Sequence, residues 1–416
     1  MLHAGQWLNY PLARRSNDLR ESVLGDNEKR NEKTGGNEMN PIVESLYREG
    51  NPDAEAVDKF IQQNQFPLVE PGHVTFVYRG QAQAVHLRSW ISGLDTAQPL
   101  VPLEASDLWA LTIELPDKSR FEYKFEVEEN GVKQLVLDDL NGVLAHDPFG
   151  ANSVCQGYGY ERPGWTLHDP TARSGSLDTL KIASRSFRDT REIQIYLPAQ
   201  FRRNRTYPLL IVHDGLDYLR YADLKNVLDN LIHRFEIPAM IVALTQSPDR
   251  LIEYTGDERQ ARFLCEELLP AIAAKFPLLD DSNARGLAGA SLGGVAALHA
   301  ASRYPKLFGQ LLLQSGSFAF SDLGRHKKDP VFDPVVRFVN EYRNTPYPIA
   351  EKIFMSCGIY ESLIYENRSL LPVLQDQGMQ IFFEEARDAH NWENWRDRLR
   401  QGLSWLFPGP LWMVYE

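Results

Sequence analysis

A serine flanked by glycines is the first candidate for chemistry in this chain. Residues Gly289-Ala290-Ser291-Leu292-Gly293 form a G-x-S-x-G sequence between an apolar stretch and a stretch typical of a helix. A strand–turn–helix of this kind holds a nucleophilic serine on a sharp turn, and glycines avoid crowding there. The helix behind the serine directs backbone N–H groups towards a developing oxyanion. We predict that Ser291 is a nucleophile; the alternative is a turn that only packs a helix on a strand.

The proton acceptor for this serine is the second group that the chemistry needs. A nucleophilic serine needs a base, and the base needs an acid that orients it. Both follow the serine along the chain when the serine lies on such a turn. His390 lies between the last strand-like and the last helix-like stretch, whereas His299 falls within a predicted helix and His326 in a charged loop. We predict that His390 is the base, with capping of the following helix as the alternative.

The orienting acid is less constrained by the sequence. Glu361 follows the apolar stretch 353–357, and a carboxylate there can reach the Nδ1–H group of the base from the C-terminal edge of a sheet. Glu366, Glu385 and Asp388 are competing carboxylates, and each could equally be a solvated surface charge. We select Glu361 as the predicted acid.

Two backbone N–H groups are candidates for binding the oxyanion. One belongs to Leu292, which directly follows the predicted nucleophile, and the other is expected in the loop after the third strand of the same sheet. That loop reads HDGLDY over residues 213–218. Gly215 permits a tight turn, and Leu216 supplies the candidate N–H group. The alternative is an ordinary turn with no catalytic task.

The N-terminal part of the chain divides into three regions. Residues 1–40 are polar and highly charged, so we predict a disordered leader in which Met39 could be the natural start. Residues 41–70 have apolar spacings that suit short helices. Residues 71–156 alternate with period two and predict a small antiparallel β-sandwich. Its expected strands are 73–78, 84–90, 109–114 and 121–128.

The rest of the chain shows a different pattern of strand-like and helix-like stretches. A connection rich in Gly, Pro and Ser is expected at 157–178. From 179 to 410, strand-like and helix-like runs alternate, and the inner strands are apolar on both faces, as in a parallel sheet covered by helices. The expected strands are 192–197, 209–213, 239–244, 285–290, 310–314, 353–357 and 379–384, and the expected helices are 224–235, 257–275 and 293–304.

Composition excludes several other classes of protein. The 416 residues carry 44 Lys and Arg against 56 Asp and Glu, a net charge of −12, which disfavours general nucleic-acid binding. No apolar run predicts a membrane span, and no H-E-x-x-H, C-x-x-C or P-loop motif occurs. Cys155, Cys265 and Cys357 are far apart, which favours buried, reduced thiols and a cytoplasmic location. The predicted chemistry needs no cofactor and no metal.

Several pieces of the second half of the chain match a known family. They are IYLPAQF, LLIVHDGLDYL, SPDRLIEY, GLAGASLGGVAALHAASRYPKLFG and LLQSGSF. The stretch from about 179 to 407 thereby resembles the esterase D family of α/β-hydrolases, and the HDGL loop is similar to the oxyanion loop of its mycobacterial mycolyltransferases. Within the family the chain looks most like the cytoplasmic enterobactin (ferric enterochelin) esterases, which carry an N-terminal β-sandwich and a linker like residues 147–153. The resemblance implies an α/β-hydrolase fold behind an N-terminal immunoglobulin-like β-sandwich.

The same resemblance implies a function. We expect a serine esterase that acts through an acyl-enzyme on a small-molecule ester, with the trilactone of a ferric catecholate siderophore as the favoured substrate. Arg250 and Glu253 are expected to line or brace the pocket. No nucleic-acid or membrane partner is expected, and the sequence leaves the oligomeric state open. One alternative is a carbohydrate acyl or feruloyl esterase, in which Trp90, Trp109 and Tyr123 of the sandwich stack on sugars instead of packing in its core. Another is a non-catalytic carbohydrate-binding or scaffold protein.

Overall fold

The chain folds into two compact units. The computed structural model describes residues 40–48, 50–92, 97–321 and 330–410. One unit comprises Met1–Trp90 and Leu94–Tyr160, and the other comprises Ile91–Gly93 and Glu161–Glu416. The predicted leader with Met39, and the charged loop that contains His326, lie outside the described residues.

Two short helices begin the described part of the first unit. Helix α2 (Pro41–Ser45) starts after Asn40, and α3 (Ala54–Gln63) starts after Asp53. Each of these preceding side chains accepts a hydrogen bond from a backbone N–H group of the first turn, which is the preferred way to cap a helix. The apolar face of α3, including Phe60, packs into the core of this unit.

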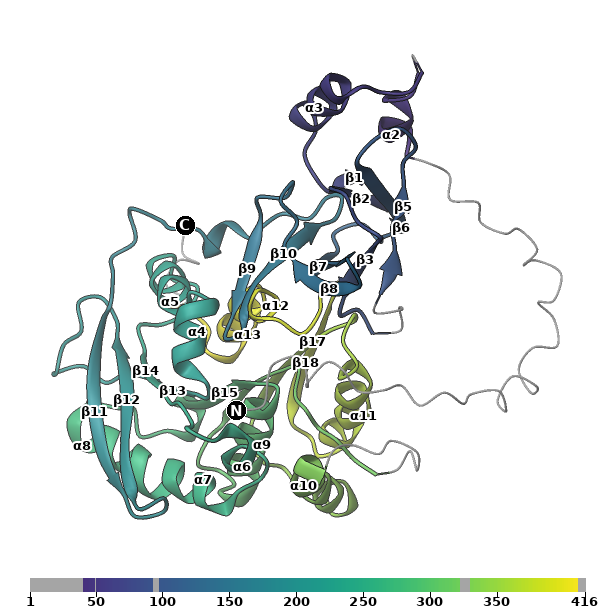
Figure 1. Ribbon diagram of the computed structural model, residues 1–416. Helices are drawn as coiled ribbons and strands as arrows, with labels where there is room; N and C mark the ends of the chain where they lie inside the picture. Colours follow the sequence, from purple (N-terminus) through teal and green to yellow (C-terminus); the bar gives the residue numbers. More distant parts are fainter. Residues whose placement is uncertain (1–39, 49, 93–96, 322–329, 411–416) are drawn as a thin grey trace. The chain divides into compact units, whose positions relative to one another are not determined.

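The remainder of the first unit is an antiparallel β-sandwich (Figure 1). One sheet has the order β1-β2-β6-β5, and the other has the order β4-β3-β7-β10-β9, with β8 paired to β7. Aromatic side chains from the two sheets meet between them, as Phe76 does with Phe121 and Tyr123. The strands are β1 (Leu68–Glu70), β2 (His73–Arg79), β3 (Ala84–Ser89), β4 (Gln98–Pro99), β5 (Val101–Pro102), β6 (Leu108–Glu114), β7 (Arg120–Glu129), β8 (Val132–Val136), β9 (Leu144–Asp147) and β10 (Gly150–Gln156).

Strand β10 forms a full strand of the sandwich, although the sequence analysis predicted no strand there. Its residues include Asn152 and Ser153, which suggest a polar connection when they are considered alone. Both side chains are buried, and both have hydrogen-bond partners. Asn152 donates to Glu122 Oε2 at 2.8 Å, and Ser153 Oγ accepts from the Asp138 N–H group at 2.9 Å. A buried polar side chain is tolerated when its hydrogen bonds are satisfied, and these partners come from other segments.

The second unit is built on an eight-stranded sheet with the order β11-β12-β14-β13-β15-β16-β17-β18. The first two strand pairs are antiparallel, and all the pairs from β14 onwards are parallel. The strands are β11 (Ser176–Ser184), β12 (Asp189–Leu197), β13 (Leu209–Val212), β14 (Ile241–Leu244), β15 (Arg285–Ala290), β16 (Gln310–Gln314), β17 (Lys352–Gly358) and β18 (Gln380–Ala386). Strand β11 has no strand prediction.

Helices cover both faces of this sheet (Figure 1), as the doubly apolar inner strands predict. Alternate residues of one strand enter two separate cores: Leu209 and Ile211 face one, and Leu210 and Val212 face the other. The helices are α4 (Gly215–Tyr221), α5 (Leu224–His233), α6 (Arg250–Glu253), α7 (Glu258–Arg262), α8 (Leu269–Lys275), α9 (Leu292–Arg303), α10 (Asp333–Asn344), α11 (Ile364–Gln375), α12 (Trp392–Arg396) and α13 (Leu399–Leu406). The predicted fold class, an α/β-hydrolase with an N-terminal β-sandwich, is confirmed.

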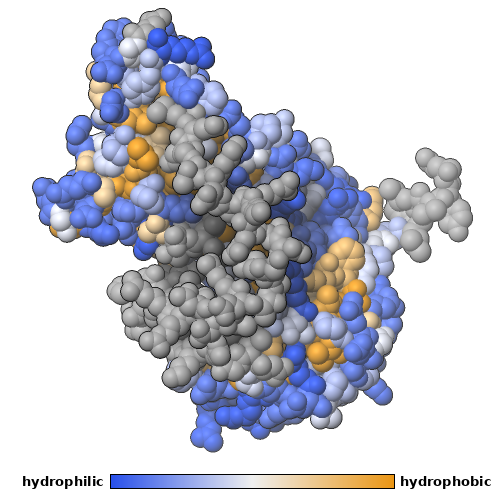
Figure 2. Space-filling model, turned by 90° about the vertical axis from the view of Figure 1, so that its right-hand side faces the viewer, coloured by the Kyte–Doolittle hydropathy of each residue, from blue (hydrophilic) through white to orange (hydrophobic). Residues whose placement is uncertain are grey.

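The visible surface is mostly hydrophilic. Figure 2 shows apolar side chains gathered in small separate areas among polar ones. Among the described residues, no helix combines the length and the apolar character that crossing a membrane requires. All three cysteines are buried and free.

Candidate active site

Ser291 lies on the sharp turn that joins β15 to α9. Its backbone has φ +56° and ψ −122°, a conformation that residues other than glycine seldom adopt. A Cβ atom at Gly289 would lie 2.4 Å from the carbonyl carbon of Gly293, so this turn cannot form with a larger residue there. The Ser291 N–H group donates to Gln314 O at 2.9 Å, and its carbonyl accepts from the Ser317 N–H group at 3.2 Å. The strained conformation is therefore held by the loop after β16.

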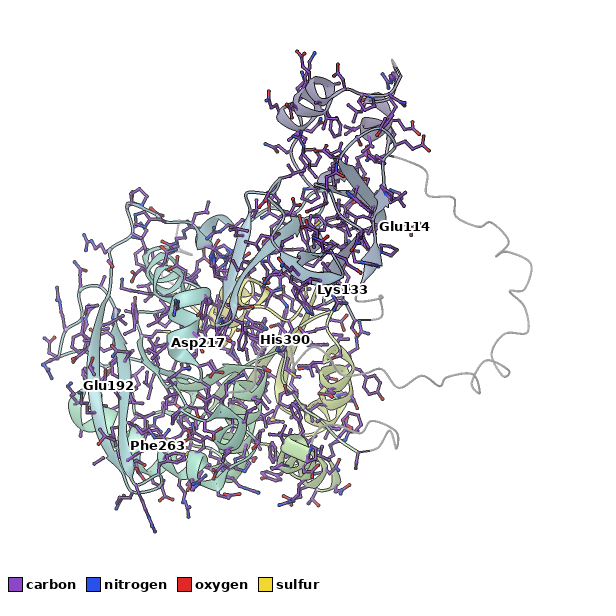
Figure 3. The ribbon with its side chains drawn as sticks, viewed as in Figure 1. Glu114, Lys133, Glu192, Asp217, Phe263 and His390 are labelled. Carbon is purple, nitrogen blue, oxygen red and sulfur yellow. The ribbon has the colours of Figure 1, made fainter. Side chains whose placement is uncertain are left out.

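Glu361 and His390 meet at the carboxyl edge of the sheet. Glu361 follows β17 and His390 follows β18, and Figure 3 labels His390 in the loop before α12. His390 Nδ1 lies 2.5 Å from Glu361 Oε2. The carboxylate side chain is 3% exposed, whereas the imidazole side chain is 32% exposed. With Nδ1–H donating to the carboxylate, Nε2 is the free acceptor of the ring.

Two of the competing carboxylates have hydrogen-bond partners of their own. Glu385 forms a two-pronged ion pair with Arg368, with both distances 2.6 Å. Asp388 accepts from the Ala389 N–H group and shapes the loop that carries the imidazole. Among the described residues, Glu361 is the carboxylate that contacts His390.

The two candidate oxyanion donors differ in their present hydrogen bonding. The Leu292 N–H group, at the first position of α9, has no acceptor in the part of the chain that the structure describes. The Leu216 N–H group, in the first turn of α4, donates to Gln246 Oε1 at 3.3 Å. A Cβ atom at Gly215 would lie 2.5 Å from the Leu244 Cα atom, which explains the glycine of the HDGL loop. A substrate oxygen could accept from the Leu292 N–H group directly. To accept from the Leu216 N–H group, it would have to displace the Gln246 side chain.

Arg250 and Glu253 form ion pairs with different partners. Arg250 Nη2 donates to Asp214 Oδ2 at 2.8 Å, and this tethers α6 to the HDGL loop. Glu253 accepts a bidentate pair from Arg191 at 2.8 and 2.7 Å and a hydrogen bond from Ser247 Oγ at 2.7 Å. The Arg250 side chain remains 41% exposed, whereas Glu253 is buried. Of these two side chains, Arg250 is therefore the more accessible to solvent.

Ser291 and His390 make no hydrogen bond to each other among the described residues. Ser291 Oγ is instead 3.2 Å from Ser317 Oγ. Catalytic hydrogen bonds are often long or unformed without substrate, so a proton transfer from Ser291 to His390 would require the hydroxyl to turn away from Ser317 first. Within the described ranges, no cluster of three or more His, Cys, Asp or Glu side chains could hold a metal ion.

Three residues of the site were not found by the sequence analysis. They are Ser317, which contacts Ser291, Ser315, which contacts Glu361, and Trp395, which contacts Ser315 and His390. The two serines lie in the LLQSGSF stretch, which carried the family resemblance but no assigned role. Trp395 gave no signal, since an aromatic residue in a helix is usually only a packing residue.

The fold and this site define the chain as a serine-hydrolase-like α/β protein. Residues 184–406 match the model of the Esterase family, described as "Putative esterase", and the chain belongs to this family.

The chain is similar to several named proteins and solved structures. The chain is 27% identical over 248 residues to an iron(III) enterobactin esterase of Escherichia coli O6:H1 (strain CFT073), covering 58% of this chain and 59% of that protein. It is 28% identical over 239 residues to the uncharacterized protein YjcH of Bacillus subtilis (strain 168), covering 56% and 97% respectively. The chain thus spans less than two thirds of the length of the enterobactin esterase. A crystal structure of the enterobactin esterase from Shigella flexneri shares the fold, with a TM-score of 0.68, 22% identity and coverage of 84% of this chain and 97% of that one.

Proposed function

We propose that the protein is a serine esterase that hydrolyses carboxylic esters through an acyl-enzyme at Ser291. The observation that carries this proposal is the position of three groups relative to one sheet. Strands β15, β16, β17 and β18 are parallel neighbours, and Ser291, Glu361 and His390 follow the first, third and fourth of them. Their carboxyl ends share one edge, where α/β folds place their reacting groups.

The proposed reaction follows from the roles of these groups. Ser291 Oγ attacks the ester carbonyl while His390 Nε2 takes its proton, and Glu361 holds the ring and stabilises the imidazolium. The N–H groups of Leu292 and Leu216 bind the oxyanion. His390 then returns the proton to the leaving alkoxide, which departs as an alcohol. Water, deprotonated by His390, attacks the acyl carbon and releases the acid and the free serine.

For the substrate we propose a small-molecule ester of the siderophore type, such as the trilactone of a ferric catecholate siderophore, which the protein would meet in the cytoplasm. The support is the name of the relatives and the presence of exposed guanidinium groups at the HDGL loop and α4. Arg220 is exposed on α4, and Arg250 is partly exposed beside the loop. Basic side chains favour an anionic ligand.

A short p-nitrophenyl ester tests the esterase proposal. Wild type should release p-nitrophenol, whereas Ser291→Ala should lose roughly 10³-fold or more of kcat/KM. Ser302→Ala is a matched control, since Ser302 is a buried serine of α9 whose hydroxyl donates to His299 O at 2.7 Å. Equal rates in wild type and Ser291→Ala would remove Ser291 from the mechanism.

Chromatography tests the substrate class. Incubation with ferric enterobactin should convert the trilactone to its linear products. An unchanged trilactone together with release of ferulate or acetate from a sugar ester would favour the carbohydrate alternative. The structure weakens that alternative at one point: Tyr123 is fully buried and packs against Phe76, so it cannot stack on a sugar.

A further inference from the structure

Trp395 contacts His390 directly and is connected to Glu361 through one hydroxyl group. Its ring lies edge-to-face against the His390 ring, with centroids 5.0 Å apart and an interplanar angle of 89°. Its Nε1–H group donates to Ser315 Oγ at 2.9 Å. Ser315 Oγ in turn donates to Glu361 Oε1 at 2.6 Å. One side chain on α12 is therefore linked to the base by ring packing and to the acid through a hydroxyl.

The direction of this hydrogen-bond chain is fixed by chemistry. An indole N–H group can only donate, so Ser315 Oγ must accept from Trp395. The single proton of the hydroxyl is then available for the ionised carboxylate of Glu361, which can only accept. The same carboxylate oxygen also accepts from the Gly358 N–H group at 2.8 Å, and the other oxygen accepts from His390. Both carboxylate oxygens thus have defined partners, and the plane of the carboxylate cannot rotate without breaking several hydrogen bonds.

Backbone and side-chain contacts also anchor Ser315 and Trp395, the two residues of this hydrogen-bond chain that lie farthest from His390. Ser315 is fully buried, has φ +46° directly after β16, and its N–H group donates to Ser356 O at 2.6 Å. The carbonyl of Trp395 accepts from Gln314 Nε2 at 2.8 Å. These contacts place the indole and the hydroxyl on the sheet rather than on a free loop. Rigid support of this kind is what holds a reacting group in its productive geometry.

We propose that Trp395 and Ser315 are positioning residues that set the orientation of Glu361 and His390 together. This inference rests on the proposed esterase function, because the orientation matters for proton transfer from Ser291. Trp395 acts through Ser315 on the acid, and neither residue touches the reacting atoms.

Kinetics of two variants and their combination test this coupling. Trp395→Phe keeps the ring against His390 but removes the donor, and Ser315→Ala removes the bridging hydroxyl. Each should lower kcat about ten-fold with KM changed less than about two-fold, as expected for loss of an interaction that acts in the chemical step. The double variant should be no slower than Ser315→Ala alone, since both changes break one chain. The proposal would be overturned if the fall in kcat of the double variant equalled the product of the two single falls, or if kcat of the single variants were unaltered.

Matched controls remove the same chemical groups elsewhere in the unit. Ser302→Ala deletes a buried hydroxyl of α9 that donates to His299 O, and Trp405→Phe deletes an indole N–H group on a ring that packs against Phe382. Neither side chain contacts the acid or the base, so kcat should stay within about two-fold of wild type. A ten-fold loss in either control would mean that kcat reports general packing, which would refute the assigned role.

A proton spectrum tests the same inference without any ester. The short His390–Glu361 hydrogen bond should give an imidazole Nδ1–H resonance well downfield of the amides, assigned by its loss in His390→Gln. Trp395→Phe and Ser315→Ala should move this resonance, and Ser302→Ala should not. An unmoved resonance in both variants would overturn the positioning role. If wild type hydrolyses no ester while the resonance responds as expected, the proposed function fails and the positioning of the pair stands.

Discussion

Each unit contains a buried polar network around one carboxylate, but the two networks end differently. In the β-sandwich, Asp138 accepts from the Tyr123 hydroxyl at 2.6 Å and from the Leu140 N–H group at 2.9 Å, and Asn141 donates to the same hydroxyl and to Val154 O. The Asp138, Tyr123 and Asn141 side chains are all buried. This network is closed, because each hydrogen bond joins one part of the sandwich to another.

The network of the second unit is open at one end. It runs from Trp395 through Ser315 and Glu361 to His390, whose side chain is 32% exposed. The buried members fix the geometry, and the exposed imidazole presents a nitrogen to a bound molecule. The comparison teaches that a buried carboxylate indicates a reactive site only when its network leads to an accessible group.

The largest expected effect comes from replacing Glu361 by its amide, with the same change at Asp138 as the control. Glu361→Gln should lower kcat/KM by roughly 10³- to 10⁴-fold, because the amide cannot hold and stabilise the imidazolium. Asp138→Asn should leave kcat/KM within about two-fold, because its network does not reach a reacting group. Ester hydrolysis by the two variants measures the difference. Similar losses in both would abolish the distinction between an open and a closed network.

The next largest effect is a loss of stability at acidic pH caused by His213, a buried residue of the second unit. Burial lowers the pKa of His213 to about 4, and its Nδ1 lies 3.0 Å from Ala288 O. Between pH 6.5 and 4 the unfolded chain binds this proton and the folded chain does not, so acidification costs up to about 3 kcal/mol of stability. Chemical denaturation at several pH values should show a smaller acid loss in His213→Asn than in wild type. Parallel curves for the two proteins would contradict this prediction.

Asp138 should contribute a pH dependence of opposite sign and slightly smaller size. Burial raises the pKa of Asp138 to about 6, so the folded chain retains a proton that the unfolded chain releases near pH 3.8. Raising the pH from 4 to 6 then costs wild type about 2 kcal/mol, a cost that Asp138→Asn should escape. The same denaturation series checks it. A variant that still loses as much stability as wild type across this window would show that another group is responsible.

The smallest effect is expected from Tyr123→Phe. Removing the hydroxyl leaves Asp138 Oδ2 without its donor inside the sandwich, at a cost of about 1–2 kcal/mol in the free energy of unfolding. Ester hydrolysis at a pH where both proteins are folded should not change. Urea denaturation measures the first quantity, and a loss of activity in the folded variant would show that the closed network does communicate with the active site.

The predictability of each element depended on how local its causes are. The turn at Ser291 could be predicted because glycines, the preceding strand and the following helix all lie within a short stretch. Strand β10 could not, because Asn152 and Ser153 become acceptable in a sheet only through partners on other segments. Trp395 was missed for the same reason, since its partner Ser315 lies 80 residues away in sequence.

By itself, the sequence determined the inner strands of the parallel sheet, the glycine-flanked turn at Ser291 and the residue types able to act as nucleophile, base and acid. These features follow from backbone preferences and side-chain periodicity, which act over a few neighbouring residues. Only the tertiary structure decided that Glu361, rather than Glu385 or Asp388, contacts His390, and that Arg250 and Glu253 bind separate partners. Such choices depend on which parallel strands lie side by side, and that order is set by packing of the whole sheet.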